Sequence, residues 1–127
     1  MSGIIASVAR EITQEQLLRY ADASGDHNPI HIDPDFARGT PFGGTIAHGM
    51  LVLALVGEMM RIAHGDAWSE SGKLKVRFKA VTRPGDTVTA SATLSKQDGD
   101  RIEYAVQCTT QAGEVVIEGR ASVRATK

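Results

Sequence analysis

An aspartate, an asparagine and a histidine lie close together in residues 24–31, SGDHNPIH. A carboxylate and an imidazole are side chains that commonly move protons to and from a bound water. In a helix, Asp26 and His31 would point about 140° away from each other, because each residue turns the chain by about 100°. Pro29 instead favours an extended residue before it, and Gly25 permits a sharp backbone path. The sequence therefore predicts a tight turn that directs Asp26 and His31 toward one point.

The same eight residues also fit an ordinary loop. Asp, Asn, Gly, Ser and Pro are the usual turn residues, so the segment could simply be a capped connection after a helix. One aspartate and one histidine acquire catalytic meaning only through their geometry. Both interpretations stay open until the surrounding elements are considered.

The whole chain has the size and composition of one ordinary globular domain, residues 1–127. Its length suffices for a single core, and 42% hydrophobic and 23% charged residues are typical of such domains. A formal net charge of −1 argues against a general nucleic-acid binder. The N-terminal segment lacks the basic start, long apolar centre and cleavage site of an export signal, so we expect a cytoplasmic protein.

The other reactive side chains give no sign of a metal site or a disulfide. Cys108 is the single cysteine, and its strand-like surroundings predict a buried, unreactive thiol. The four histidines show no metal-ligand spacing, so neither a metal nor a cofactor is expected. We expect His27 to be exposed and His64 to bond the last carbonyls of a helix. His48 should either support the site or bond backbone at a helix end.

Helix signals lie on both sides of the Asp26 segment. A threonine–glutamine capping box ahead of an apolar run predicts a helix over about residues 14–23. An aspartate cap followed by Pro34 predicts a second, shorter helix that ends at Gly39. Residues 3–10 favour a weak edge strand, and residues 40–44 a flexible loop.

The longest apolar segment, residues 46–63, carries large apolar side chains around most of a helical circumference. Such a pattern is typical of a helix that is buried on nearly all sides. A membrane span is not expected, because Glu58 and Arg61 interrupt the apolar run. The segment therefore predicts a central helix covered by other elements, with Gly49 close to its start.

Four later segments alternate apolar and polar side chains as strands do: residues 74–81, 87–94, 102–108 and 115–123. Glycine-containing turns separate them, which favours an antiparallel sheet with one apolar face. That face must cover something, and the apolar helix is the available element. The simplest architecture is an α+β fold in which a curved antiparallel sheet wraps around a central helix.

Three stretches of the chain resemble a known family. YADASGDHNPIHID at 20–33, IAHGM at 46–50 and VRFKAVTRPGDTVTA at 76–90 are similar to the MaoC-like (R)-specific enoyl-CoA hydratases and acyl dehydratases. The resemblance implies the hot-dog fold. It also implies that Asp26 and His31 are the catalytic residues, which act on a water molecule.

The resemblance assigns roles to neighbouring residues as well. The backbone amide of Gly49 would form the oxyanion hole, Asn28 would help to hold the water, and His48 would be further support. Chemistry argued independently agrees for Gly49, because hydration of an enoyl thioester places negative charge on the thioester oxygen, and an amide at a helix N-terminus stabilises such charge. A homodimer or higher homo-oligomer is also implied, whereas no nucleic-acid or membrane partner is expected.

We therefore expect a hydro-lyase that reversibly adds water to a trans-2-enoyl-CoA and gives the (R)-3-hydroxyacyl-CoA. One alternative is a dehydratase subunit that acts on 3-hydroxyacyl groups carried by acyl carrier protein. Another is a non-catalytic module that binds acyl thioesters. A thioesterase is less favoured, because hot-dog thioesterases place their acid differently.

Two further groups of residues have more than one interpretation. Some side chains of the apolar helix could line an acyl pocket instead of the ordinary core: Met50, Leu53, Gly57 and Met60. Five cations on or near one predicted strand could meet the phosphates of coenzyme A or an acidic carrier protein: Lys73, Lys75, Arg77, Lys79 and Arg83. A solvated strand face is the more ordinary explanation for these cations.

Overall fold

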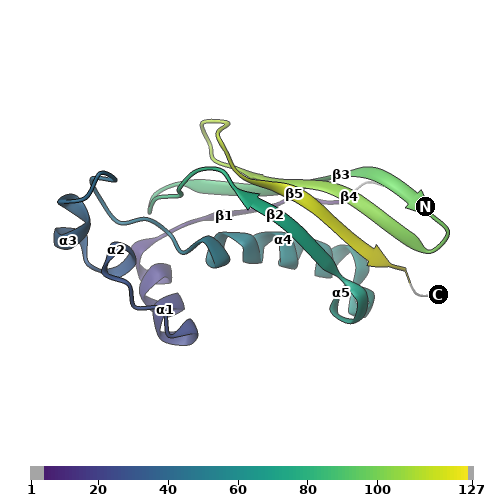
Figure 1. Cartoon of the computed structure of the whole chain (residues 1–127), viewed down its shortest axis with the longest axis horizontal. Coiled ribbons are helices and arrows are strands. Elements are labelled where there is room, and N and C mark those ends of the chain that lie inside the picture. Colours follow the sequence, from purple (N-terminus) through teal and green to yellow (C-terminus); the bar gives the residue numbers. More distant parts are fainter. Residues whose placement is uncertain (1–4, 126–127) are drawn as a thin grey trace.

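A computed structural model describes residues 5–125, in which one face of a five-stranded antiparallel sheet lies over a long helix (Figure 1). The helices are α1 (Gln14–Ser24), α2 (Pro29–Ile32), α3 (Pro34–Arg38), α4 (Gly49–His64) and α5 (Asp66–Ser71). The strands are β1 (Val8–Glu11), β2 (Lys73–Phe78), β3 (Thr87–Asp98), β4 (Arg101–Thr109) and β5 (Val115–Arg124). This arrangement confirms the predicted α+β class and the hot-dog fold.

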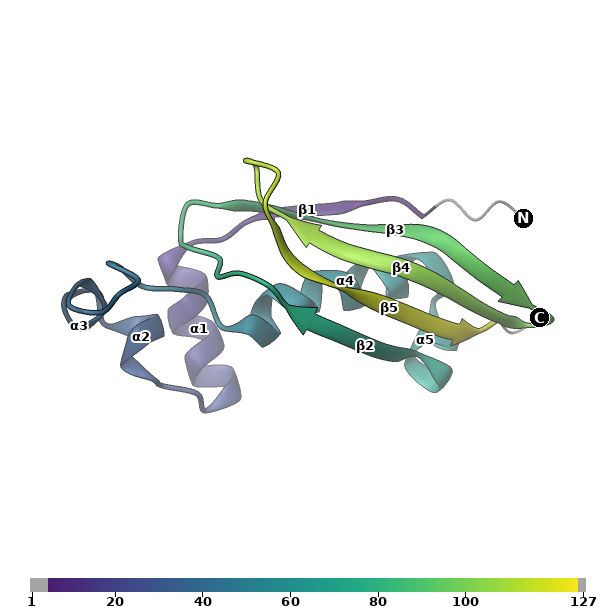
Figure 2. The same ribbon diagram turned by 45° about the horizontal axis from the view of Figure 1, so that its top comes forward.

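The sheet order is β1-β3-β4-β5-β2, so the four predicted strands are present but do not follow one another in chain order (Figure 2). Strands β3, β4 and β5 form consecutive antiparallel pairs, whereas β2 pairs with β5 at the far edge. The connection from β2 to β3 therefore crosses the end of the sheet. The predicted turn lies within it, because Gly85 has a φ of 99° and the Asp86 amide donates to the Arg83 carbonyl at 3.0 Å.

Local hydrogen bonds explain where α1 begins and ends. The Thr13 hydroxyl accepts from the Gln16 amide at 3.2 Å, and the Gln16 side chain accepts from the Thr13 amide at 3.3 Å. Gly25 then adopts a left-handed φ of 81°, and its amide donates to the Ala21 carbonyl at 2.9 Å. The predicted capping box is confirmed, and it fixes the point at which the chain enters the Asp26 segment.

The core lies between α4 and the inner face of the sheet. Its largest fully buried side chains include Val56, Met59 and Met60 of α4 and Val88 and Ile117 of the sheet. Apolar residues at α4 positions three and four apart lie on one face of the helix, and that face meets the sheet. Helices α1, α2 and α3 gather at the end of the sheet where α4 begins (Figure 1).

Helix α4 begins at Gly49, three residues later than the apolar pattern predicted. The backbone before it is held extended, because the Ile46 amide donates to the Ile30 carbonyl at 3.1 Å and the Ala47 amide donates to the Thr82 carbonyl at 2.7 Å. These amides therefore bind neighbouring segments instead of starting the helix. The later start makes Gly49 the first helical residue.

The expectation that α4 is buried on nearly all sides is wrong for this chain. The sheet covers one face of the helix, while Met50 and Ile62 keep 58% and 65% of their surface exposed. Apolar side chains on the second face are consistent with contact with another surface.

The N-terminal edge is a short strand, as predicted, and β1 pairs with β3. Of the segment predicted for this strand, residues 3 and 4 lie outside the described residues.

None of the helices within residues 5–125 combines the length and hydropathy that a membrane crossing requires.

Burial alters the pKa values of three groups, Cys108, His64 and Tyr104. Burial raises the pKa of the Cys108 thiol to about 11, which confirms the prediction of a buried, unreactive cysteine. The prediction for His64 is wrong, because its Nε2 lies 2.9 Å from the Tyr104 hydroxyl of β4 instead of bonding helix carbonyls. Burial lowers the pKa of His64 and raises the pKa of Tyr104, so both groups are neutral near pH 7.

The cations of β2 lie on the outer face of the sheet, away from α4. Lys73, Lys75 and Arg77 are exposed, and the Lys79 amine lies 3.7 Å from the Glu118 carboxylate. Lys75 and Arg77 line a shallow depression that also contains acidic side chains. This mixture of charges fits the ordinary interpretation, a solvated strand face.

Candidate active site

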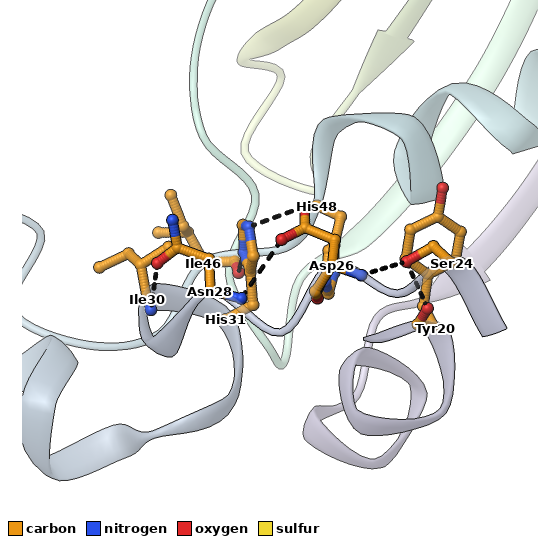
Figure 3. Close-up of polar contacts among 8 residues, drawn as sticks. All are labelled: Tyr20, Ser24, Asp26, Asn28, Ile30, His31, Ile46 and His48. Carbon is orange, nitrogen blue, oxygen red and sulfur yellow. Dashed lines mark hydrogen bonds and ion pairs between the residues drawn. The ribbon is translucent and has the colours of Figure 1, made fainter. Parts of the chain in front are cut away.

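The Asp26 segment is fixed by hydrogen bonds from its own backbone (Figure 3). The Asp26 amide donates to the Ser24 hydroxyl at 3.2 Å, and the Asn28 amide donates to Oδ1 of Asp26 at 3.2 Å. Oδ1 of Asn28 then accepts from the Ile30 amide at 3.0 Å and caps the one-turn helix α2. His31 therefore lies on a single helical turn, where the sequence predicted only a tight turn.

The imidazole of His31 has a defined orientation. Its Nδ1 donates to the Ile46 carbonyl at 2.8 Å, because a carbonyl oxygen can only accept. In the neutral ring, Nε2 then carries the lone pair, and this atom lies 3.9 Å from Oδ2 of Asp26. The structure thus brings Asp26 and His31 together, with side chains that are 53% and 12% exposed.

A separation of 3.9 Å is too long for a direct hydrogen bond. An ionised Asp26 and a neutral Nε2 of His31 are both acceptors, so they do not bind each other. A molecule with two donors can satisfy both groups at once, and water is the smallest such molecule. The geometry therefore suits a water that donates one hydrogen to each side chain and directs its oxygen lone pairs elsewhere.

A second imidazole supports the first. The His48 ring stacks on the His31 ring with centroids 3.8 Å apart and planes inclined by 24°, and the Tyr20 ring contacts His48 in a T-shaped arrangement with centroids 4.8 Å apart. Nε2 of His48 donates to the Asp26 carbonyl at 3.1 Å. His48 thus fits both sequence interpretations, because it hydrogen-bonds backbone at a helix end and also contacts His31 in the site. Tyr20 is part of the sequence motif, but the sequence alone assigned it no role.

His48 is neutral at physiological pH. The ring is 3% exposed, and burial lowers its pKa, with the nearby His31 ring acting in the same direction and the Asp26 carbonyl opposing it. Its Nδ1 is buried and has no hydrogen-bond partner within residues 5–125. By contrast, His27 is exposed, as predicted, and its hydrogen bond to Asp22 raises its pKa.

Asp26, His31 and His48 offer possible ligand atoms within 4.8 Å of one another, which raises the question of a metal ion. The stacked rings are nearly parallel, so their in-plane lone pairs run side by side instead of converging on one point. One nitrogen of each ring also already donates to a carbonyl. The arrangement is better suited to binding a water than to binding an ion.

The first turn of α4 lies directly after His48. The amides of Leu51 and Val52 donate to the His48 carbonyl at 3.1 and 3.3 Å, whereas the first two helical amides, those of Gly49 and Met50, have no acceptor within a helix. Gly49 itself is exposed. Because helix amides carry partial positive charge at this end, the position suits a developing negative charge.

Hydrogen bonds from outside the Asp26 segment also hold His31. The Gln14 side chain donates to the His31 carbonyl at 2.9 Å, and the Thr45 hydroxyl donates to the Gln14 side chain at 2.6 Å. Both contacts join residues far apart in the chain, so no local sequence signal reveals them.

The four residues considered for an acyl pocket separate into different environments. Met60 lies in the core with 0% exposure and lines no open surface, whereas Met50 is 58% exposed. Leu53 is half-buried. Gly57 faces open space, because a Cβ added there would meet no atom within 4 Å.

We predict that His48→Gln makes stability less dependent on pH in the acid range. The lowered pKa of His48 means that the unfolded chain binds its proton more readily, so this contribution to stability is present above pH 6.5 and is lost as pH falls. Glutamine can donate to the Asp26 carbonyl but does not titrate. Thermal melts from pH 5 to 8 should show a smaller decrease of Tm than in the wild type.

His27→Gln is the matched control, because the pKa of His27 is raised and its contribution is present below pH 6.5 and lost as pH rises. In this variant, the decrease of Tm between pH 8 and pH 5 should therefore be steeper than in the wild type or the same. An unaltered pH profile in His48→Gln would contradict the assignment of a buried neutral His48.

Comparison with known proteins agrees with this geometry. The model of the MaoC like domain matches residues 3–116. The chain is 35% identical over 123 residues to an (R)-specific enoyl-CoA hydratase of Rhodospirillum rubrum, covering 95% of this chain and 85% of the relative. It is 30% identical over 126 residues to a 3-hydroxybutyryl-CoA dehydratase of Methylorubrum extorquens, covering 98% and 80%.

Solved structures give the same answer. The unliganded R-hydratase PhaJ1 of Pseudomonas aeruginosa superposes with a TM-score of 0.87 at 29% identity, over 100% of this chain and 83% of that one. The (R)-hydratase of Aeromonas caviae superposes with a TM-score of 0.84 at 26% identity, over 99% and 97%. Because the family model covers most of its length, the chain belongs to the MaoC-like dehydratase family.

Proposed function

We propose that this protein is an (R)-specific enoyl-CoA hydratase that adds water to a trans-2-enoyl-CoA, and that the reaction is reversible. The observation that carries the proposal is the pair formed by Oδ2 of Asp26 and Nε2 of His31, 3.9 Å apart, with the His31 tautomer fixed by the Ile46 carbonyl. Two relatives, named as an (R)-specific enoyl-CoA hydratase and a 3-hydroxybutyryl-CoA dehydratase, support the reaction class.

The proposed reaction begins with a water that donates to both Asp26 and His31. As its oxygen attacks carbon 3 of the enoyl group, one of the two side chains takes a proton from the water. The same pair then returns a proton to carbon 2, so the sum of the steps adds one water to the double bond. Both side chains lie within reach of the same water, so the acid and base roles are assigned to Asp26 and His31 as a pair.

Negative charge develops on the thioester oxygen when carbon 3 is attacked. The Gly49 amide is the proposed donor to this oxygen, because it is exposed and starts α4 directly after the ring that stacks on His31. A positioned oxyanion donor of this kind contributes about 10²–10³ in rate. Asn28 is proposed to help hold the water through its side-chain amide, since its oxygen already caps α2.

Stereochemistry follows from the placement of the proton-handling groups. Asp26 and His31 lie at one point, so water and proton reach the same face of the bound double bond. The face presented to the pair then sets the configuration at carbon 3, for which we propose R.

Coenzyme A thioesters are the preferred substrates in this proposal, because two relatives are named for CoA substrates. A dehydratase acting on acyl carrier protein would use the same Asp26 and His31. Parallel assays with CoA and carrier-protein thioesters separate the two substrates. A non-catalytic binding module is disfavoured, because the acid, the imidazole and the helix N-terminus are all present together.

We further propose that the protein acts as a homodimer or higher homo-oligomer. Helix α4 leaves Met50 near its start and Ile62 near its end exposed, and β2 is an edge strand of the sheet. A second copy could cover this apolar surface, which is costly to leave in water.

The acyl chain is proposed to lie along α4. Gly49, Leu53 and Gly57 are spaced by four residues and therefore share one side of the helix. Leu53 is half-buried and Gly57 faces open space, so this side leaves room for a chain extending from the thioester.

We predict that Asp26→Asn and His31→Gln each lower kcat by about 10²–10⁴, because each removes a proton-transfer group. The rate is measured as loss of enoyl-thioester absorbance, with chiral analysis of the product. Asp35→Asn is the control, since Asp35 is an exposed carboxylate paired with Arg38 on α3. Full turnover by folded Asp26→Asn protein would refute the proposed mechanism.

Gly57→Leu is predicted to shorten the range of accepted acyl chains. A leucine side chain would occupy the open space beside Gly57, so kcat/KM should fall for octanoyl-length substrates while crotonyl-CoA is turned over normally. Gly57→Ala is the control for changes in the helix itself. Equal loss for short and long chains would argue against an acyl chain along α4.

Ile62→Lys is predicted to reduce the mass measured by light scattering to that of one chain of 13.6 kDa, because it places a charge on the exposed apolar face. The control is Lys96→Ala, an exposed change on β3. A wild-type protein that is already monomeric would disprove the proposed oligomer.

A further inference from the structure

The aromatic ring of Phe78 lies against the first residue of α4. A Cβ built on Gly49 would lie 2.9, 3.2 and 3.4 Å from Cε1, Cδ1 and Cζ of Phe78. These three distances are nearly equal, so the Cβ position lies over the face of the ring and not beyond its edge. The ring therefore covers one side of the Gly49 backbone.

This contact is specific to position 49 of the helix. Gly57, the other glycine of α4, has no atom within 4 Å of its Cβ position. A side chain at position 49 would thus require the Phe78 ring to shift, whereas one at position 57 would enter open space. The Phe78 ring is what makes the difference.

Phe78 is largely exposed, as are the other two phenylalanines of the chain, Phe36 and Phe42. It is the last residue of the edge strand β2, it pairs with Ile117, and it keeps 52% of its surface in contact with solvent. The ring therefore keeps a solvent-accessible surface beside the exposed first residue of α4. A ligand bound at the Gly49 amide would meet this ring.

We propose that Phe78 is a positioning residue for the thioester carbonyl, an inference that rests on the proposed function of this site. The ring is a rigid apolar wall beside the Gly49 amide. It keeps water from that side of the amide and limits the directions from which the carbonyl oxygen can approach. The Gly49 amide stabilises the thioester oxygen most when that oxygen lies where negative charge develops. The Phe78 ring, by fixing the direction of approach, should therefore lower the free energy of the transition state more than that of the bound substrate.

Phe78→Leu tests this role, because leucine stays apolar but cannot form a flat wall. We expect kcat for crotonyl-CoA to fall by roughly tenfold to hundredfold with KM little changed, on the order of the cost of a 1 Å misplacement. Phe36→Leu is the matched control, since Phe36 of α3 is also 52% exposed. Retention of wild-type kcat in Phe78→Leu, or an equal loss in Phe36→Leu, would overturn the inference.

A double-mutant cycle tests the contact itself. Gly49→Ala keeps the backbone amide but places a methyl group against the Phe78 ring, so it should lower kcat strongly. Phe78→Ala makes space for that methyl group, so the double variant should be more active than the product of the two single effects predicts. If the two single substitutions lower kcat additively, the proposed contact is not coupled to catalysis. If both single variants have a lower Tm but an unchanged kcat, the role of Phe78 is purely structural.

Failure of the inference is distinguishable from failure of the proposed function. If Asp26→Asn abolishes turnover while Phe78→Leu does not change it, the reaction stands and the positioning role of Phe78 is wrong. If Asp26→Asn keeps full activity, the proposed function itself is wrong.

Discussion

The site depends on one short stretch of extended backbone, residues 46–48, held between two neighbours. Its amides donate to the carbonyls of Ile30 and Thr82, which tie it to α2 and to the connection ahead of β3. The Ile46 carbonyl is thereby free to accept from His31 and to fix its tautomer. The same constraint delays the start of α4 to Gly49. Two hydrogen bonds thus help to place both His31, which we propose transfers a proton, and the amide proposed to face the oxyanion.

Features fixed by local hydrogen bonds could be predicted from the sequence. The capping box of α1 and the aspartate–proline start of α3 need only residues a few positions apart, and each was found where expected. The strands could also be predicted, because each one alternates apolar and polar side chains and so carries its own apolar face. The convergence of Asp26 and His31 was predictable for the same reason, since Gly25 permits the sharp path after α1 and Pro29 restricts the backbone at the start of α2.

Features fixed by distant contacts could not be predicted in this way. The pairing of β2 with β5 depends on which strand edges remain free after β3, β4 and β5 have paired. The contacts of His48 with Tyr20 and of His64 with Tyr104 join separate elements, so helix-end chemistry predicted the wrong partner for His64. The burial of α4 was overestimated because an apolar side chain does not reveal whether its own chain covers it.

His31 and His48 have different proposed roles: His31 transfers a proton, and His48 supports the His31 ring from the side. A charged His48 would lie 3.8 Å from the His31 ring, so any positive charge formed on His31 during the reaction would be opposed. Burial keeps His48 neutral and removes this repulsion. Its Nε2 donates to the Asp26 backbone carbonyl and does not occupy Oδ2 of the carboxylate. In the proposed mechanism, His48 fills the space beside Asp26 and His31 without sharing their proton, so these two side chains exchange that proton with water alone.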